Sequence, residues 1–485
     1  MVVLQADSNP DLTTRLATEG LLSKSGSRPI YLSSIEVNGG ETFSTEFFKK
    51  LLRPLINNGD YTLNQLIAAV ESSRENLAKT NVFNKVNARL HSDFTAVIPP
   101  SIKNYNKERS IATKVIFDLS SVKLNIGEGF LNFNNEESVN IDLNYLNNNF
   151  NNNAELVNFG VNYNPYKPND HLYTNGRFLA SLNNPSFKFL FDVFHSHQNN
   201  EVWQQSSEGS TGGIIGVQYN KSKDLNILTG LSLVKRTIHN IDDAADDQLR
   251  FYAGDFLKSS IIHQVSYARD VKYLNHLTKN FVTDGNRVNI SSEIASNQEQ
   301  DNIDNSSVFF KSTVSLNSFK SFFNNYITSH LSADFGGIYT TNEKSSVHVS
   351  DKFYLGGINS FRGFSKNGVH ENGGLQFYKL SGTIYSKVPS FLYAPQAPTH
   401  INDVAYEANP LRLYTQGTIG NVSNNLLQEL SIPASVGFGI RYFNHWANFD
   451  VGYFVSKRLG DDNNIFGIKD GLQFSVSIGG TNRLT

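Results

Sequence analysis

Cysteine is absent from this chain of 485 residues, and its absence excludes several kinds of protein at once. Disulfide scaffolds, Cys-ligated zinc sites, iron–sulfur clusters and thiol catalysis all depend on that residue. Long hydrophobic runs are absent too. The chain contains no stretch of about 18 apolar residues, the length that a helix needs to cross a bilayer. A formal net charge of -2 gives no electrostatic reason to expect nucleic acid as a partner.

Motifs of catalysis are also missing. The sequence has no P-loop, no dinucleotide-binding fingerprint after a strand and no HExxH. His195 and His197 alternate with Ser196 and so share one face of a strand, but no acidic or Cys partner stands at metal-site spacing. We therefore expect a protein that is not an enzyme and that has neither a cofactor nor a metal site.

The first twenty residues, "MVVLQADSNPDLTTRLATEG", show no targeting pattern. A secretory signal needs basic residues followed by an apolar stretch, and a mitochondrial transit peptide is rich in Arg and poor in acidic residues. Asp7, Asp11 and Glu19 do not suit a transit peptide, and no apolar stretch follows a basic one. The sequence therefore predicts neither kind of cleaved leader.

The pattern of the chain changes near residue 121. Residues 1–27 form a polar tail, and residues 28–121 mix helical and strand periods in the order β-α-α-β-β. One helix is expected over "STEFFKKLLRPL", with Ser44 as its N-cap and Pro54 near its end, and a second from about Thr62 to Asn81. The two helices would pack on a short sheet as a small α+β domain.

Residues 122–485 alternate between apolar and polar side chains. Segments such as "SVNIDLNYLN", "LVNFGVNY" and "ANFDVGYFV" place an apolar residue at every second position. About sixteen such segments fit into this length, at roughly 23 residues for each strand and its connection. The alternation predicts a mainly β fold, but it leaves open whether the apolar face meets a protein core or lipid.

Three features favour lipid. The segments run to about ten residues, which is long for a soluble sheet. The opposite face is small and polar, as a water-filled lumen requires, and Tyr and Phe recur near segment ends like the girdles at membrane interfaces. We therefore predict a transmembrane β-barrel of about sixteen strands, rather than a large soluble β protein. Closing the barrel would also remove the exposed edges of such long strands.

One connection, residues 340–373, is much longer than a hairpin turn and contains "DKFYLGGINSFRGFSKNGV". Loops of this length are usually functional or disordered. Phe361 and Phe364, which flank Arg362 and Gly363, argue against disorder. An isolated "FRGF" would be better explained as a surface turn with a solvated Arg.

Taken together, these parts resemble the outer-membrane β-barrel assembly superfamily. "TNVFNKVNARL" resembles a strand of its polypeptide-transport-associated (POTRA) domain, and "DKFYLGGINSFRGF" resembles its sixth extramembrane loop, which folds back into the barrel. The resemblance covers nearly the whole chain past residue 28. Bacterial members carry several POTRA domains and a secretory signal, whereas this chain has room for one domain and shows no signal. The resemblance therefore points to the mitochondrial branch, the barrel subunits of the sorting and assembly machinery.

The resemblance implies a function and a location. It implies a non-enzymatic insertase that folds unfolded β-barrel precursors into the mitochondrial outer membrane, with the lipid bilayer and accessory subunits of the complex as further partners. The POTRA domain, residues 28–121, would face the intermembrane space. The alternative is a pore, either a translocator like those of two-partner secretion or a diffusion porin. A porin needs neither the first domain nor the "FRGF" loop, and a secretion translocator usually has two POTRA domains and a secretory signal.

The last segment, "KDGLQFSVSI" at residues 469–478, would close the barrel against "KLNIGEGF". The seam would contain Ile126, Gly127 and Gly129 in the first strand and Gly471 and Gln473 in the last. Because glycine contributes no cross-strand packing, this seam should be weaker than its neighbours and could open sideways as a lateral gate. We expect Ile126 and Gln473 to lie close enough for a crosslink.

The same segment resembles the β-signal of the family, which is a polar residue, any residue, Gly, any two residues, a hydrophobic residue, any residue and a hydrophobic residue. Lys469, Gly471, Phe474 and Val476 stand at the four defined positions. The resemblance implies that the chain is itself a client of the kind of machine that it forms.

Arg362 needs an acidic partner if its loop folds into the lumen. By alternation, Asp450 in "ANFDVGYFV" and Asp334 in an earlier segment both point away from the apolar face. The resemblance places the partner of the loop in the closing strands, so we predict the pair Arg362–Asp450. A charge-assisted pair in that setting is stronger than one on the surface.

Overall fold

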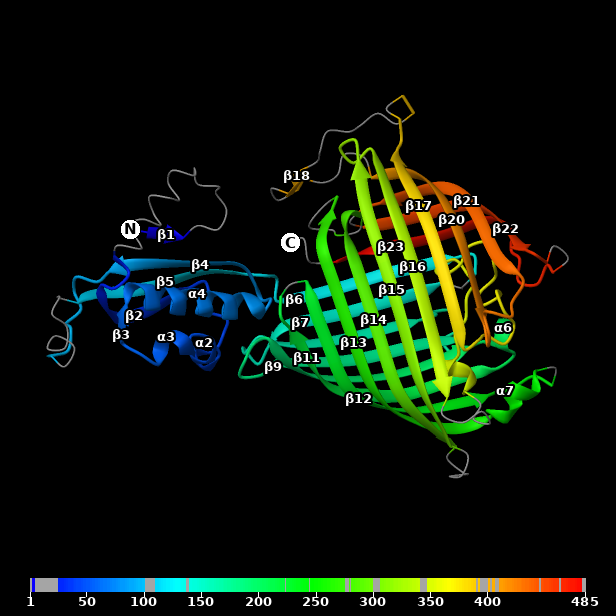
Figure 1. Cartoon of the computed structure of the whole chain (residues 1–485), viewed down its shortest axis with the longest axis horizontal. Helices are drawn as coiled ribbons and strands as arrows, with labels where there is room; N and C mark the ends of the chain where they lie inside the picture. Colours follow the sequence, from blue (N-terminus) through cyan, green and yellow to red (C-terminus); the bar gives the residue numbers. More distant parts are fainter. Residues whose placement is uncertain are drawn as a thin grey trace. The chain divides into compact units, whose positions relative to one another are not determined.

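The computed structural model divides into two compact units (Figure 1). The first comprises Met1–Asn125, Leu146–Val157 and Phe178–Phe189, and the second comprises Ile126–Tyr145, Asn158–Arg177 and Leu190–Thr485. The structure describes residues 2–4, 25–100, 110–136, 139–222, 224–243, 245–274, 279, 281–299, 306–340, 347–389, 391–392, 400–401, 404–405, 410–444, 446–461 and 464–481.

The N-terminal part of the first unit is a five-stranded sheet with helices. Its strand order is β1-β4-β5-β2-β3, in which β2 and β5 run parallel and the other neighbours antiparallel. The elements are β1(Val2–Leu4), β2(Pro29–Asn38), α2(Thr45–Leu51), α3(Arg53–Ile56), β3(Asp60–Thr62), α4(Leu63–Lys79), β4(Phe83–Ser92) and β5(Ile111–Ser121). The hydrophobic core beneath the helices includes Leu55, Leu66, Leu77, Val115 and Phe117, whose side chains have no exposed surface.

Local sequence explains where these helices begin and end. The Ser44 Oγ accepts a hydrogen bond from the Phe47 backbone N–H at 3.1 Å, as an N-cap does. Thr62 and Gln65 form a reciprocal capping box at the start of α4. Asn81 follows α4 with a φ of 64°, a left-handed conformation that ends helices and that Asn tolerates.

Three details of this domain differ from the sequence prediction. The first expected helix is divided, because α2 ends at Leu51 and α3 begins at Arg53. Pro54 therefore lies in the first turn of α3, where its missing N–H costs nothing, and not at a helix end. Of the predicted polar tail, only residues 2–4 and 25–27 are described, and residues 2–4 form β1, which pairs with Ala88–Leu90 of β4.

Sixteen strands close into a barrel in which neighbours in sequence are neighbours in space (Figure 1). β23 pairs with β6 and completes the ring. The mainly β fold with a barrel of about sixteen strands and an N-terminal α+β region, as predicted, is confirmed. The strands are β6(Asn125–Asn134), β7(Asn140–Phe150), β8(Glu155–Tyr163), β9(His171–Ser181), β10(Phe187–Asn199), β11(Ser207–Asn220), β12(Leu225–His239), β13(Gly254–Tyr273), β14(Val282–Glu299), β15(Ser306–Phe322), β16(Ile327–Thr340), β17(Gln376–Lys387), β20(Leu411–Ser423), β21(Ile432–Phe443), β22(Ala447–Leu459) and β23(Gly471–Thr481).

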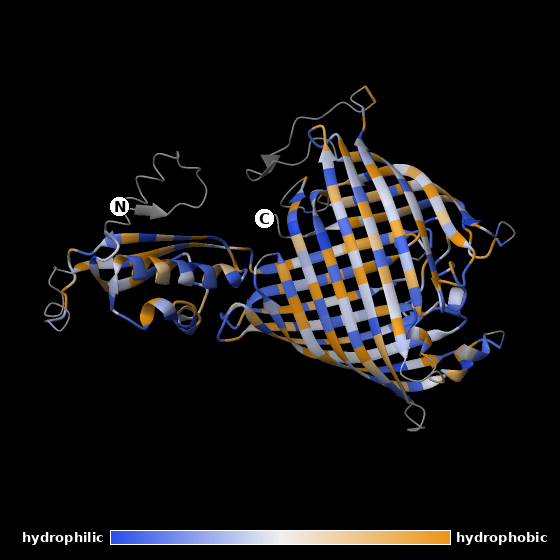
Figure 2. Ribbon diagram, viewed as in Figure 1, coloured by the Kyte–Doolittle hydropathy of each residue, from blue (hydrophilic) through white to orange (hydrophobic). Residues whose placement is uncertain are grey.

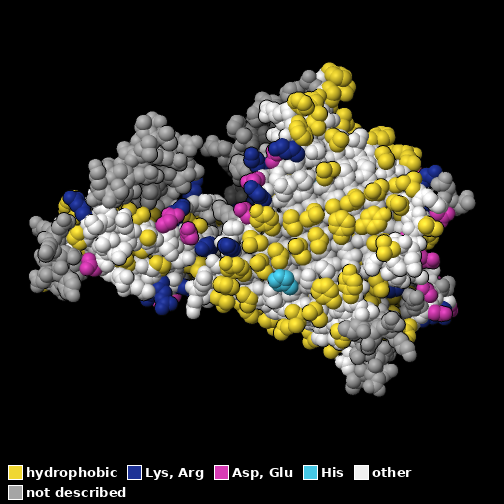
Figure 3. All heavy atoms as spheres, viewed as in Figure 1, with side chains coloured by type: hydrophobic (Ala, Val, Ile, Leu, Met, Phe, Trp, Pro, Cys, Tyr) yellow, Lys and Arg dark blue, Asp and Glu magenta, His cyan; other side chains and the backbone are white. Residues whose placement is uncertain are grey.

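The outward face of the barrel is apolar. Leu331 and Val436 are 61% and 67% exposed, and apolar side chains at alternate positions of the other strands are exposed as well. Figure 2 shows the alternation of apolar and polar residues along the strands, and Figure 3 shows apolar atoms spread over the wall. An apolar outer band is the face that lipid requires.

Within the described part of the chain, no helix is both long enough and apolar enough to cross a bilayer.

The barrel has two ends, which we define by β6. The near end is where β6 begins and the far end is where it finishes. Because successive strands alternate in direction, the far end carries the connections with α6(Glu201–Gln204) and α7(Asp247–Phe251), the long connection with the short helix η1(Val349–Asp351), and residues 460–461 and 464–470. A small two-stranded sheet, β18(His400–Ile401) and β19(Val404–Ala405), lies in the connection before β20.

Candidate functional site

The connection between β16 and β17 turns inward and packs on the inner wall. We name its described residues, 347–375, the inner loop; residues 341–346 of the predicted loop lie outside the described residues. The inner loop shares a hydrophobic cluster with Ala295 of β14 and Phe309 of β15. Both point inward, because their neighbours Ile294 and Phe310 are exposed on the outer face. The members that the inner loop contributes are Val347, Phe353, Leu355, Phe361, Phe364 and Val369.

Arg362 lies near the middle of the inner loop in sequence and binds Asp450 of β22 through two hydrogen bonds. Its Nη1 donates to Asp450 Oδ1 and its Nη2 to Asp450 Oδ2, both at 2.9 Å. Nη1 also donates to the Tyr414 hydroxyl at 2.7 Å, and that hydroxyl donates to Asp450 Oδ1 at 2.7 Å. The structure thus brings together the two residues that alternation and resemblance paired, and it adds Tyr414. Asp334, the other inward carboxylate, binds Ser315 and Lys379 instead.

The neighbours of Arg362 hold the loop in place. The Phe361 and Phe364 rings have no exposed surface, and their centroids are 5.0 Å apart. Gly363 has a φ of 90°, and a Cβ there would lie 3.0 Å from the Ser456 Cβ, so only glycine fits. Its carbonyl accepts from the Ser456 hydroxyl at 2.5 Å and from the Lys469 backbone N–H at 2.8 Å. The "FRGF" stretch is therefore buried structure and not a solvated surface turn.

A second anchor, which the sequence pattern does not predict, holds the first half of the inner loop. Asp351 is 1% exposed and binds Arg236 of β12 through two hydrogen bonds of 2.7 and 3.0 Å. Lys258 of β13 and Asn297 of β14 each donate to the same carboxylate at 2.8 Å. Lys311 of β15 donates to the Asp351 backbone carbonyl at 2.7 Å. The carboxylate thus ties the loop to three neighbouring strands, and the backbone carbonyl of the same residue ties it to a fourth.

We expect Asp351→Asn to loosen the inner loop without removing the barrel. The change leaves Arg236, whose side chain is 11% exposed, without its anionic partner. Breaking a buried ion pair on one side costs about 3–5 kcal/mol of stability. Trypsin cleavage at Lys352 and Lys366 in folded protein should become fast, while heat-modifiable migration on gels persists. Asp224→Asn, at an exposed turn, should leave both unchanged; slow cleavage in Asp351→Asn would contradict the anchor.

The seam between β23 and β6 is short. Ser475–Thr481 pair with Glu128–Asn134, a ladder of seven residues. By contrast, β11 and β12 pair over fourteen residues, from Ser207 to Asn220. Within the seam Gly480 lies opposite Gly129, and a Cβ at Gly479 would lie 2.0 Å from the Gly129 carbonyl oxygen. Of the three predicted seam glycines only Gly129 lies in this ladder, and Gly479 and Gly480 supply the glycines of β23.

The predicted proximity of Ile126 and Gln473 is wrong. Neither residue is in the ladder with the opposite strand; Gln473 pairs with Gly452 of β22, and Gly471 pairs with Phe454 of β22. At the register of the ladder Gln473 lies level with position 136, which is about 33 Å along the strand from Ile126. Gly127 likewise precedes the ladder. Alternation fixes the face of each side chain, whereas register depends on turns and on the stagger of the barrel.

The residues of the predicted β-signal lie at the start of β23. The Lys469 backbone binds the inner loop at Gly363, and Gly471 begins the strand with a φ of 119°. The Phe474 ring lies 6.5 Å from the Phe133 ring of β6. Val476 lies opposite Phe133 and is buried by its neighbours. The beginning of the signal therefore contacts the inner loop and its end contacts the seam.

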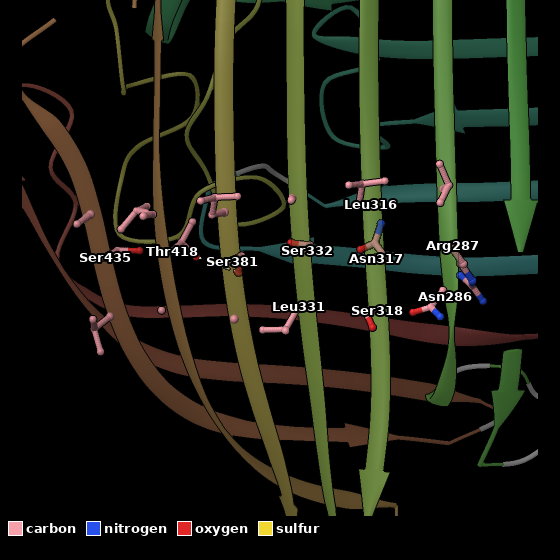
Figure 4. A pocket seen from close by; sticks show the side chains of 18 residues that line it. Asn286, Arg287, Leu316, Asn317, Ser318, Leu331, Ser332, Ser381, Thr418 and Ser435 are labelled. Carbon is pink, nitrogen blue, oxygen red and sulfur yellow. Dashed lines mark hydrogen bonds between the residues drawn. The ribbon is translucent and has the colours of Figure 1, made fainter. Parts of the chain in front are cut away.

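The wall also has a shallow depression of about 720 Å³ between β14 and β21. Figure 4 shows its lining, which includes Leu316, Leu331 and Ser381. Gly382 and Gly417 lie opposite each other there, in β17 and β20. None of the predicted site residues lines it.

Comparison with known proteins places the chain in a family. Residues 120–481 match the Omp85 superfamily domain, and the chain belongs to that superfamily. Within it, the chain fits a barrel subunit of the SAM50 type. It is 24% identical over 494 residues to a SAM50-like protein of Schizosaccharomyces pombe, an alignment that covers 94% of this chain and 92% of that protein.

Solved structures share the fold. BamA from Haemophilus ducreyi lacking POTRA domains 1–3 superposes with a TM-score of 0.68 at 10% identity, covering 98% of this chain and 95% of that one. CdiB from Acinetobacter baumannii superposes with a TM-score of 0.54 at 13% identity, covering 96% and 80%. At these identities the likeness concerns the fold.

Proposed function

We propose that this chain is a non-enzymatic insertase that folds β-barrel precursors into the mitochondrial outer membrane. Membership of the Omp85 superfamily and the SAM50-like relative support a role in barrel assembly in an outer membrane. The single observation that carries the mechanism is the seven-residue, glycine-containing seam between β23 and β6. The partners are unfolded precursors, the bilayer and accessory subunits of a sorting and assembly complex.

The seam is the place where the barrel opens sideways. Parting a ladder exposes backbone N–H and C=O groups, which is costly in a membrane. A short ladder without side-chain packing at Gly129 and Gly480 makes that cost smaller here than along the fourteen-residue ladder of β11 and β12. The two exposed edges are then satisfied by strands of a precursor, which add by β-augmentation. Release follows when the precursor closes on itself.

The inner loop favours assembly over diffusion. Its buried cluster and two charged anchors fill inner-wall positions from β12 to β22 that a diffusion pore would leave to water. A translocator of the secretion type would share the fold, as CdiB does. The SAM50-like relative, aligned over 94% of this chain, supports assembly instead.

The N-terminal domain, residues 28–121, delivers precursors from the intermembrane space. Its sheet can accept an added strand, because β1 pairs with only Ala88–Leu90 of the ten-residue β4.

Deleting residues 28–121 should slow precursor transfer by roughly tenfold and leave the barrel folded. A tenfold slower rate corresponds to an activation free energy that is higher by about 1.4 kcal/mol. Timed import of a radiolabelled precursor, with heat-modifiability of the truncated barrel as control, measures both. Loss of the barrel itself would show that the domain is structural.

Depletion tests the function as a whole. Cells in which this protein is depleted should accumulate unassembled precursors of several outer-membrane barrels, and re-expression should restore their assembly. A block confined to one exported substrate, with other barrels assembled normally, would instead support the translocator.

A further inference from the structure

Glu136 places a buried carboxylate where the first and last barrel strands meet the inner loop. It follows β6 at the far end, and its side chain is 5% exposed. Its Oε2 accepts a hydrogen bond of 2.6 Å from the Ile358 backbone N–H. Gly357 permits this approach, because a Cβ there would lie 2.9 Å from the same oxygen. The inner loop and the first strand are thus joined directly.

The second oxygen of this carboxylate is under-used. Glu136 Oε1 has no hydrogen-bond partner among the described residues and lies 4.0 Å from the Lys469 Nζ, which is a long ion pair. A carboxylate can accept about four hydrogen bonds, and burying one with few partners is costly. Oε1 is therefore free to accept a donor, and Lys469, with a side chain 41% exposed, occupies that position loosely.

The contacts beside Glu136 hold the backbone of β23 and do not depend on its side chains. Where the ladder ends, the Asn135 side chain takes over: its Nδ2 donates to the Leu472 carbonyl at 3.0 Å, and its Oδ1 accepts from the Phe474 N–H at 3.3 Å. Any strand in the place of β23 could make these two bonds. The contact between Glu136 and Lys469 differs because it involves a side chain at the first position of the β-signal pattern.

We propose that Glu136 is a specificity-determining residue that reads this first, polar position in an incoming precursor. The inference rests on the proposed function, in which the precursor's signal strand pairs with β6 in place of β23. A Lys or Arg there gives Glu136 a charge-assisted hydrogen bond, a Gln gives a neutral one, and a Glu places two carboxylates together. The ligand class is thus a β-strand that begins with a basic or amide side chain.

The test uses one precursor in three versions, with Lys, Gln or Glu at the first signal position. Membranes carrying the full wild-type chain should assemble the Lys version roughly tenfold faster than the Glu version, the effect of about one charge-assisted hydrogen bond. Glu136→Gln should assemble all three at similar rates. Glu136→Lys should reverse the order, because the Glu version then finds a cation.

Glu128→Gln is the matched control. It removes a carboxylate from the same strand at the other end of the ladder, opposite Thr481, and should keep the preference for Lys. Equal rates for Lys and Glu in the wild type, or a preference that survives in Glu136→Gln, would overturn the proposal. If Glu136→Gln does not fold, the order of the three versions in Glu136→Lys decides it, and an order that stays as in the wild type would overturn the proposal. Failure of the wild type to assemble any version would overturn the proposed function, and this inference with it.

Discussion

Arg362→Glu should prevent the barrel from reaching its folded state, the largest loss of stability that we expect. The substitution places a carboxylate against Asp450 and leaves the Tyr414 hydroxyl facing two negative charges. Breaking a buried pair on one side costs about 3–5 kcal/mol even without the added repulsion. Because native proteins are stable by only about 5–15 kcal/mol, little would remain. Heat-modifiable migration and protease resistance of the variant in membranes measure the loss.

Reversing the pair should restore part of the fold. In Arg362→Glu with Asp450→Arg, the two groups can pair again, but Arg441 lies directly opposite position 450 in β21 and will repel the new cation. Lys235→Glu serves as the control, because the Lys235 side chain is 52% exposed in its pair with Asp255. Losing such an exposed pair should lower the stability by about 1 kcal/mol or less. Equal damage in the single and double variants would contradict a direct pair.

Locking the seam should abolish assembly without unfolding the protein. Asn132 and Ser477 lie opposite each other in the ladder of β6 and β23. Directly opposite residues in antiparallel strands lie within about 5.5 Å of each other at their Cα atoms, a separation that a disulfide can span. The chain has no native cysteine, so Asn132→Cys with Ser477→Cys creates a single possible bridge. Precursor assembly should stop in oxidised membranes and return on reduction.

The control is a bridge elsewhere in the wall. Ser232 and Ser260 lie opposite each other in β12 and β13, and both are buried on the inner face. Cysteines at these two positions should form a bridge with no effect on assembly, because that ladder need not open. Full activity of a fully bridged seam variant would eliminate sideways opening as the mechanism, although the fold would stand.

Much of this architecture was predictable because it depends on local periodicity. The alternation in "ANFDVGYFV" placed Asp450 on the inner face, and the structure has it there. Ser44 could be recognised as an N-cap, and the second helix could be placed from about Thr62, because such signals need only residues a few positions apart. Helix division at Leu52 was missed, since Pro54 fits both the end of one helix and the first turn of the next.

The rest of the candidate site was not predictable because it depends on register and on distant segments. Glu136 meets Ile358 across 222 positions of sequence, and Arg236 meets Asp351 across 115. The alternation of apolar and polar residues around Arg236 and Lys258 predicts that both cations point inward, where each needs an anionic partner. Nothing local to "VSDKF" assigns that partner to Asp351. The register of β23 against β6 depends in the same way on the stagger of the whole barrel.

Crosslinking of an arrested precursor tests the central claim, that precursors enter through the seam. A single cysteine would replace Asn132 in β6 or, for comparison, Ser260 in β13, and another would be placed in the final strand of a precursor too long to be released. We predict disulfides between the precursor and position 132 and none with position 260. Crosslinks at position 260 as frequent as those at position 132 would contradict entry at the seam.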